Sequence, residues 1–202
     1  MRPPARNAAA TRERLLECAR KGFVQESYDA VGLREIAGAA GVDVALIGRY
    51  FGSKEQLFRA ALATEDNRWE ELAQADDLPS YLAAMAVTDD SKDAEHIERL
   101  LIMLRSAASP TASTIVRSTF QNEVLQPFAN VLTGPQAERR AAMALSVLMG
   151  TTIMRTILRI DHDGGCENDT LKVRLSGMLR IALAPDEAGS DAISLTRLEA
   201  LR

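Results

Sequence analysis

Helical periodicity runs along nearly the whole chain and is broken mainly at glycine and proline residues. Segments that alternate apolar and polar residues, as half-buried strands do, are almost absent. The sequence therefore predicts an all-α protein. The intervals between the breaks predict helices at residues 12–25, 33–40, 44–50 and from 54 onward, followed by 79–87, 94–108, 111–132, 136–160 and 171–183.

Start and stop signals mark the helices of the N-terminal third. Thr11 is expected to cap the first helix, and Gly41 suits the left-handed residue that follows the second. Asp43 is expected to cap the third helix. Ser53 lies three residues before Gln56, the spacing of a capping box at the start of the fourth.

Proline and glycine also shape the predicted C-terminal helices. Gly134-Pro135 is a start signal that places proline in the first turn of the longest helix. Pro127 falls inside the segment 111–132 and is expected to kink it. The residues after 185 are expected to form a loosely held tail, in which 192–201 could form a terminal helix.

The two short helices at 33–40 and 44–50 have the length of a helix-turn-helix, and Gly41-Val42-Asp43 provides its turn. The second helix would then lie in the major groove of DNA. Gly48 within it costs about 1 kcal/mol relative to alanine. Either Gly48 permits close approach to DNA, or the site simply tolerates glycine. The expected apolar core of this unit consists of Phe23, Ile36, Ala37, Val42, Ile47, Leu57 and Phe58.

An ordered set of motifs spans residues 11–60. It comprises Thr11-Arg12-Glu13-Arg14-Leu15-Leu16, Phe23, Ile36-Ala37, Gly41-Val42 and the closing run Ile47-Gly48-Arg49-Tyr50-Phe51-Gly52-Ser53-Lys54-Glu55-Gln56-Leu57-Phe58. This set resembles the DNA-binding domain of the tetracycline-repressor (TetR) family. The part from Arg49 to Leu57 is its most specific portion.

The resemblance implies roles for individual residues. The Tyr50 hydroxyl and the Lys54 ammonium would each meet a DNA phosphate, Lys54 with help from the positive end of its helix. Arg49 would read a guanine edge, and Val44 and Ala45 would touch thymine methyl groups. The alternatives are a half-buried core aromatic for Tyr50 and solvated surface charges for the two cations. Phe51 is expected in the core.

Two positions depart from the family pattern. Gly32 stands where Thr or Ser usually caps the second helix and touches phosphate, and Gly48 stands where an aromatic residue is usual. The first change removes one phosphate contact, and the second alters the expected footprint on DNA.

Charge is unevenly distributed along the chain, although the net charge of −4 alone would not suggest a nucleic-acid partner. Residues 1–60 hold ten Lys and Arg against seven Asp and Glu, whereas the remaining residues hold 14 against 21. A polyanion would therefore be attracted to the first part and repelled by the second.

The segment 136–160 is apolar nearly all round, so the helix is expected to be buried on two faces. One face would meet its own core and the other a second subunit; the alternative is a central helix of a monomer. A dimer would carry two recognition helices roughly 34 Å apart, as a palindrome requires. The last helix would complete a four-helix interface through Leu171, Leu175, Met178, Leu179 and Ala182.

The family resemblance also implies a pocket for a small-molecule effector. Large, adaptable side chains in the C-terminal body are candidates, with ordinary core packing as the alternative for each. Arg105 and Glu123 would be polar anchors or solvent-facing residues. The candidates are Trp69, Met85, Met103, Phe120, Phe128 and Met149.

Other classes of function find little support. Only His96 and His162 are available, and neither a catalytic triad nor a glycine-rich phosphate loop is present, so we expect no enzyme and no cofactor. The loop 161–169 gathers possible metal ligands, but Lys172 stands where a calcium loop needs Glu, so no metal site is expected. Cys18 and Cys166 form no disulfide framework.

The expected location is the cytoplasm, because no apolar run could form a signal or cross a membrane. The expected organisation is a flexible basic arm at 1–10, a helix-turn-helix domain at 11–60, a helical ligand-binding and dimerisation domain at 61–185 and a tail at 186–202. The predicted function is a ligand-responsive repressor that binds a palindromic operator as a homodimer. The alternative is a helical dimeric interaction protein with weakened or lost DNA binding, which the Gly32 and Gly48 departures leave open.

Overall fold

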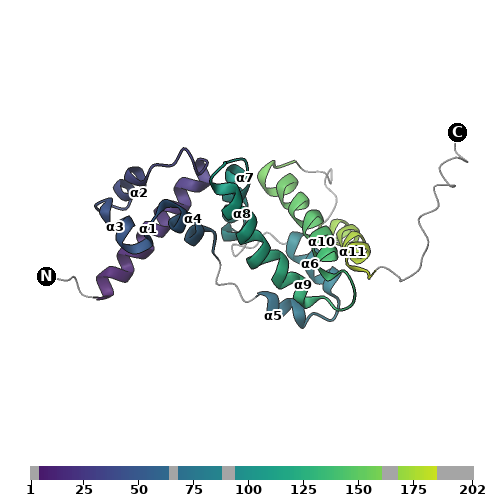
Figure 1. Ribbon diagram of the computed structural model, residues 1–202. Coiled ribbons are helices and arrows are strands. Elements are labelled where there is room, and N and C mark those ends of the chain that lie inside the picture. Colours follow the sequence, from purple (N-terminus) through teal and green to yellow (C-terminus); the bar gives the residue numbers. More distant parts are fainter. Residues whose placement is uncertain (1–4, 64–67, 88–93, 161–167, 186–202) are drawn as a thin grey trace, which may run out of the picture. The chain divides into compact units, whose positions relative to one another are not determined.

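The computed structural model describes residues 5–63, 68–87, 94–160 and 168–185. Within these ranges every regular element is a helix, which confirms the all-α class (Figure 1). The chain divides into two compact units. Unit 1 consists of Met1–Arg68 and Thr88–Pro127, and unit 2 of Trp69–Val87 and Phe128–Arg202.

Unit 1 contains the predicted helix-turn-helix together with later helices. In it, α1 packs against α2, α4 and α7, and α4 packs against α3, α7 and α8. A π-helical segment continues α8 and leads into α9 (Gln126–Val131), which ends in unit 2. The other elements are α1 (Ala5–Gln25), α2 (Leu33–Ala39), α3 (Ala45–Phe51), α4 (Lys54–Leu62), α7 (Ala94–Ser106), α8 (Ala112–Phe120) and the π-helical segment Gln121–Leu125.

One hydrophobic cluster joins the helix-turn-helix to α7 and α8. All seven predicted core residues belong to it or pack against it, as do Ile102 of α7 and Ala112 and Ile115 of α8. The helix-turn-helix therefore does not close a core by itself. Because α2 and α3 have only seven residues each, they bury little apolar surface without these additional helices. The predicted domain boundary at residue 60 consequently differs from the boundary of the compact unit.

The first helix begins earlier than the sequence predicted. It starts at Ala5 rather than residue 12, so Thr11 lies within the helix and does not cap it. Residues 5–10 of the predicted flexible arm are helical. Ala8, Ala9 and Ala10 have the highest intrinsic helix propensity of any residue type and extend the helix toward the N-terminus.

The turn between α2 and α3 has the predicted chemistry. The backbone N–H of Val42 donates to the carbonyl of Ala37, and that of Gly41 donates to Gly38, both at 3.0 Å. Gly41 has a φ of 64°, so this is a Schellman turn with glycine at its left-handed position. It ends α2 and redirects the chain into α3.

Side chains cap the next two helices as predicted. Asp43 Oδ1 accepts the backbone N–H of Ala45 at 2.7 Å, although Val44 occupies the capping position by backbone geometry. Ser53 Oγ accepts the backbone N–H of Gln56 at 3.2 Å at the start of α4. These bonds fix where α3 and α4 begin.

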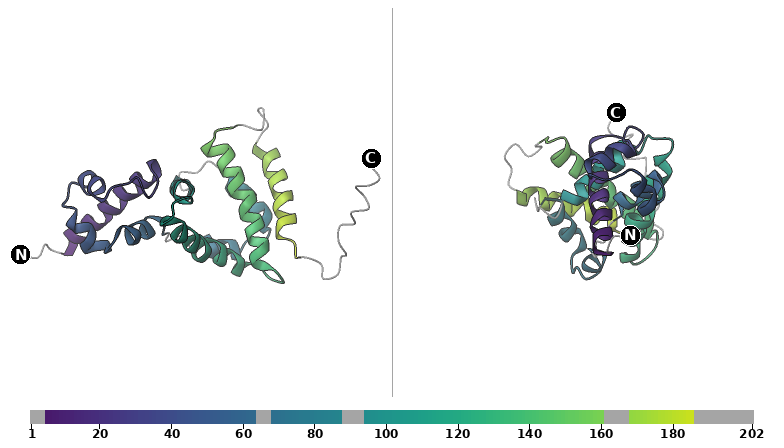
Figure 2. Two further views of the ribbon diagram at one scale, coloured as in Figure 1. Left: turned by 45° about the horizontal axis from the view of Figure 1, so that its top comes forward. Right: turned by 90° about the vertical axis from the view of Figure 1, so that its left-hand side faces the viewer.

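Unit 2 is built around α6, α10 and α11, which pack against one another (Figure 2). Arg180 and Asp77 form a salt bridge at 3.0 Å that ties α11 to the segment before α6. Buried Arg140 of α10 donates to the carbonyls of Leu183, at 2.9 Å, and Thr133. The elements are α5 (Arg68–Ala73), α6 (Leu78–Val87), α10 (Ala137–Thr152), the π-helical segment Ile153–Ile157 and α11 (Asn168–Leu183).

Several predicted helices differ in detail. The segment 111–132 contains a π-helical stretch that ends at Leu125, two residues before Pro127, where the kink was expected. Proline cannot donate a backbone hydrogen bond, and a π turn accommodates the interrupted ladder. The helix predicted at 136–160 begins at Ala137, after Gln136 in a left-handed conformation (φ 53°), so Pro135 precedes the helix. It is not the longest helix, because α10 has 16 residues and α1 has 21. Helix α5 was not predicted.

Two predictions fall outside the described residues. These are the tail after 185, with its optional helix at 192–201, and the loop 161–167. Within the part of the chain that the structure describes, no group of three or more His, Cys, Asp and Glu side chains could hold a metal ion. No described helix is long and apolar enough to cross a membrane.

Candidate DNA-binding surface

Helix α3 has one buried and one exposed face. Ile47 is fully buried and Phe51 is buried beneath it, so this side belongs to the core of unit 1. Ala45 and Arg49 are exposed, as is Val44 directly before the helix. The predicted recognition residues therefore lie on the outward face, and the expectation that Phe51 is a core residue is confirmed.

Gly48 lies on the same exposed face. A Cβ atom built there would meet no protein atom within 4 Å. Its φ is not in the left-handed region, in contrast to Gly41 and Gly52. Neither packing nor backbone conformation within unit 1 therefore requires glycine at this position.

Lys54 lies in the first turn of α4, but its side chain is only half-exposed. Its ammonium Nζ lies 4.6 Å from the centroid of the Tyr28 ring, which is a cation–π contact. Tyr28 itself is buried in the turn between α1 and α2. The lysine is thus held beside an aromatic face at the positive end of a helix.

Burial and neighbouring charges shift the pKa values of Tyr28 and Glu55. Burial raises the pKa of Tyr28 to about 12, and the neighbouring Glu55 carboxylate adds to the rise. A hydrogen bond from the Ser53 side chain is the main cause that lowers the pKa of Glu55, and Tyr28 contributes to the same shift. The start of α4 therefore places Lys54 and an ionised Glu55 near the neutral phenol of Tyr28.

Tyr50 is half-buried and packs against the core cluster. This placement agrees with the alternative interpretation of Tyr50 as a partly buried aromatic. It leaves part of the side chain accessible, so a phosphate contact through the hydroxyl stays a prediction.

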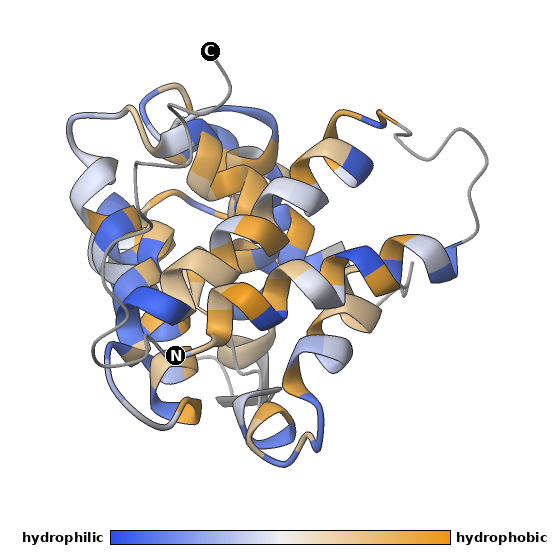
Figure 3. Ribbon diagram, turned by 90° about the vertical axis from the view of Figure 1, so that its right-hand side faces the viewer, coloured by the Kyte–Doolittle hydropathy of each residue, from blue (hydrophilic) through white to orange (hydrophobic). Residues whose placement is uncertain are grey.

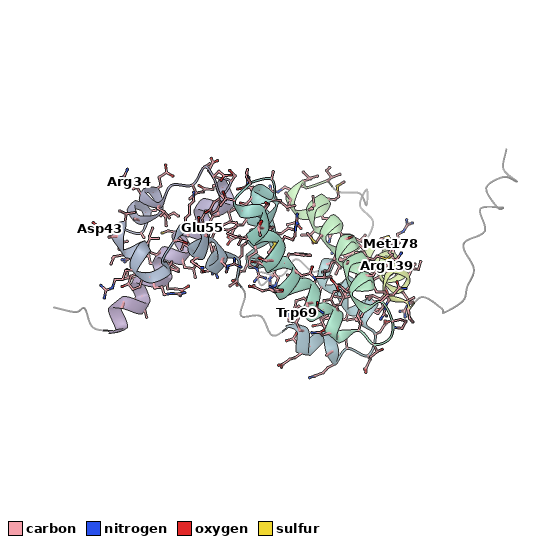
Figure 4. The ribbon with its side chains drawn as sticks, in the orientation of Figure 1. Arg34, Asp43, Glu55, Trp69, Arg139 and Met178 are labelled. Atoms are coloured by element: carbon pink, nitrogen blue, oxygen red, sulfur yellow. The ribbon has the colours of Figure 1, made fainter. Side chains whose placement is uncertain are left out.

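Further cations of unit 1 were not among the predicted contacts. The guanidinium carbon of Arg12 lies 4.9 Å from the centroid of the Phe51 ring, which places Arg12 beside the end of α3. Arg34 is exposed in the first turn of α2, and Figure 4 shows it projecting outward there. The signal for both was available, because each stands in the charge-biased first 60 residues on an exposed helical face.

Glu35 partly compensates for the missing side-chain cap at the N-terminus of α2. Gly32 has no side chain to accept a backbone N–H, but the Glu35 carboxylate accepts the backbone N–H of Gly32 at 3.1 Å. This is one half of a capping box. The fold of α2 is therefore intact, whereas the hydroxyl that would reach a phosphate is absent.

The predicted effector residues are divided between the two units. Trp69, Met85, Phe128 and Met149 belong to unit 2, whereas Met103 and Phe120 belong to unit 1. Within unit 2, Trp69 and Phe128 stack with ring centroids 6.1 Å apart and Phe128 is buried. Within unit 1, Met103 packs against the core cluster. A shared effector pocket for the six candidates stays a prediction.

Two family models match the chain. The model described as bacterial regulatory proteins, tetR family, matches residues 15–61, and the model described as Tetracyclin repressor-like, C-terminal domain, matches residues 76–185. The second match alone covers more than half of the 202 residues. No curated protein matches the chain.

Solved structures share the fold at low sequence identity. One is NalD, the secondary repressor of the MexAB-OprM multidrug efflux pump in Pseudomonas aeruginosa, with a TM-score of 0.63 and 19% identity over 89% of this chain and 100% of NalD. Another is a transcriptional regulator from Rhodococcus sp. Rha1, with a TM-score of 0.56 and 22% identity over 85% of this chain and 95% of that one.

Proposed function

Because the chain belongs to the TetR family of bacterial regulatory proteins, we propose that it binds a palindromic operator as a homodimer and represses transcription until a small-molecule effector binds. The proposed place of action is the cytoplasm. The repressor role is taken by analogy with NalD, which shares the fold. No catalytic step is proposed.

One observation carries the proposal, namely the division of α3 into two faces. Ile47 and Phe51 anchor the helix to the core, and the opposite face, with Ala45, Gly48 and Arg49, is free of contacts that would occlude it within unit 1. A helix held in this manner can enter a major groove with its small residues close to the bases. Arg49 is the proposed base-reading residue and Lys54 a phosphate contact.

The proposed homodimer rests on an exposed apolar face of unit 2. Val173 and Ile181 of α11 are 74% and 78% exposed, which is unusual for large aliphatic side chains. Met178 on α11 and Met143 on α10 are also exposed. Figure 3, which views the side where α11 lies, shows hydrophobic residues interspersed with hydrophilic ones along the helices there. A second copy that packs α10 and α11 against the same helices would cover this face.

Part of the predicted dimer interface is wrong. Leu175, Leu179 and Ala182 are buried within unit 2 and so are unavailable to a partner. The exposed stripe lies on the other side of α11, where Gly177 and, on α10, Gly150 have open space at their Cβ positions. Small residues of this kind let two helices approach closely.

The proposed effector response acts through α4. This helix packs against α7 and α8 in unit 1, and Arg59 Nη1 of α4 lies 3.5 Å from Ser118 Oγ of α8. A ligand that favours a different position of α7 or α8 would move α4 and thereby change the placement of α3. Such a ligand shifts the balance only by its difference in affinity for the two states.

In vitro selection of bound DNA from a random pool tests the proposal. The expected result is a palindrome with half-sites about one helical turn apart. Affinity for the selected site, measured by gel shift at two salt concentrations, should fall steeply as salt rises. If no sequence is enriched and binding is absent at low salt, the proposal is wrong and the dimeric interaction protein without DNA binding takes its place.

A further inference from the structure

Tyr28 connects three parts of unit 1. Its ring contacts Phe23, with centroids 6.2 Å apart, and Phe58 edge-on, with centroids 5.0 Å apart. Its backbone N–H donates to Ser106 Oγ at 3.1 Å, across 78 positions of sequence. Ser106 is the last residue of α7 and is completely buried. Both the ring and the backbone of Tyr28 are therefore fixed from within.

Lys54 contacts the face of this fixed ring. The lysine ammonium lies 4.6 Å from the ring centroid, in the first turn of α4. A lysine side chain on a helix surface ordinarily samples many rotamers, which costs side-chain entropy when it binds a partner. The contact with Tyr28 restricts that freedom and holds the charge near the α4 terminus before DNA arrives.

The position of the ring in turn depends on α7. The Tyr28 backbone lies in the turn between α1 and α2, and the hydrogen bond to Ser106 is its direct link to α7. If the end of α7 moves, this buried N–H loses its acceptor unless Tyr28 follows. An unsatisfied buried N–H is costly, so Tyr28 is expected to follow.

We infer that Tyr28 is the positioning residue for Lys54, and that Ser106 passes the position of α7 to the lysine through it. The inference rests on the proposed phosphate contact of Lys54. Tyr28 contacts no DNA in this scheme; it sets where the lysine ammonium lies. The lysine would then be displaced from the phosphate whenever α7 occupies another position.

The test compares salt dependence of operator binding in paired variants of the full chain. Tyr28→Leu removes the aromatic face, whereas Tyr28→Phe keeps it and is the matched control. Each is measured with Lys54 present and in combination with Lys54→Ala. We expect Lys54→Ala to lower the salt slope by about two, one for each subunit of the dimer, in the Tyr28→Phe background and much less in Tyr28→Leu. Tyr28→Leu alone should lose about 3- to 10-fold in affinity at low salt.

If the role of Tyr28 is purely structural, Tyr28→Leu should lower the melting temperature, but Lys54→Ala should change the salt slope equally in the Tyr28→Phe and Tyr28→Leu backgrounds. That result would overturn the inference. If Lys54→Ala leaves the slope unchanged even in the wild-type chain, the phosphate contact of the proposed function fails as well. The two failures are thus distinguishable.

Two further variants test the inference even if Tyr28→Leu does not fold. A trifluorinated phenylalanine at position 28 keeps the ring shape but weakens its attraction for cations, and it should reproduce the loss of coupling to Lys54. Ser106→Ala removes the acceptor on α7 and leaves Tyr28 intact. Ser106→Ala should weaken operator binding, and the double variant with Lys54→Ala should bind no more weakly than Lys54→Ala alone. If the losses of affinity of the two single variants instead add up in the double variant, the role of Ser106 is contradicted.

Discussion

At the scale of single residues, Arg49 and Lys54 are two cations with different surroundings. Arg49 is exposed on the outward face of α3, whereas Lys54 is half-buried against Tyr28. We predict that Arg49→Ala costs about 1–3 kcal/mol on the selected operator and little on random DNA. Lys54→Ala should weaken binding to both DNAs alike and lower the salt slope by about two, one for each subunit of the dimer. Equal losses on the two DNAs for Arg49→Ala would remove its base-reading role.

The raised pKa of Tyr28 makes stability depend on pH. An acid whose pKa is higher in the folded than in the unfolded protein stabilises the fold at low pH, and here the contribution is lost as pH rises from about 10 to about 12. The ionised phenol would face Glu55, Asp29 and Lys54, and its burial is the main cost. Urea denaturation between pH 9 and 11 should show a steeper loss for the wild type than for Tyr28→Phe. Equal slopes would show that Tyr28 ionises normally.

Gly48 allows the two explanations of its presence to be separated. Since no protein atom lies near its missing Cβ, Gly48→Ala should stabilise the fold by up to about 1 kcal/mol through helix propensity. If close approach to DNA requires glycine, the same variant should lose operator affinity. Gly52→Ala is the control, because a φ of 84° makes alanine strained there and should destabilise the fold. Unchanged affinity for Gly48→Ala would favour mere tolerance at the site.

At the scale of elements, α4 depends on the cap that Ser53 provides. Ser53→Ala leaves the Gln56 N–H without its side-chain acceptor and should lower the free energy of unfolding by about 1 kcal/mol. The control is Ser146→Ala in α10, where the hydroxyl only returns to the carbonyl of Ala142 within the helix. Chemical denaturation compares the two, and an equal effect of both variants would contradict the capping role.

Local signals of this kind explain which elements were predictable. Gly41 and Ser53 act within a few residues, so the boundaries of α2 and α4 followed from sequence alone. The start of α1 did not, because a run of alanines carries no cap and simply propagates the helix. The π-helical segment before Pro127 was expected only as a kink, since periodicity does not distinguish a π turn from an α turn.

Contacts between elements were less predictable. The apolar stripes of α10 and α11 were evident, but a stripe does not specify which neighbour covers it. Leu175 and Leu179 face the interior of unit 2, while Val173 and Ile181 remain exposed. The outward face of α3 was predictable for the opposite reason, because the anchors Ile47 and Phe51 repeat at helical spacing and leave only one side free.

At the scale of the whole molecule, operator recognition and self-association should fail together. A palindrome offers two half-sites, and one copy of the chain carries one α3. Binding of two linked recognition helices gains from the effective concentration of the second once the first is bound. A chain that folds normally but cannot associate should therefore bind a single half-site and the full palindrome with similar affinity.

Ile181→Glu tests this dependence. The side chain is 78% exposed in the single chain, so a carboxylate is well solvated there and the single chain should still fold. In a dimer the same charge would be buried against apolar neighbours and would oppose association. Light scattering should then report a monomer with weakened binding to the palindrome. Leu104→Glu, at an exposed apolar position of α7 in unit 1, is the control and should stay dimeric. A dimeric Ile181→Glu protein with full operator affinity would place the interface elsewhere than on this face of α11.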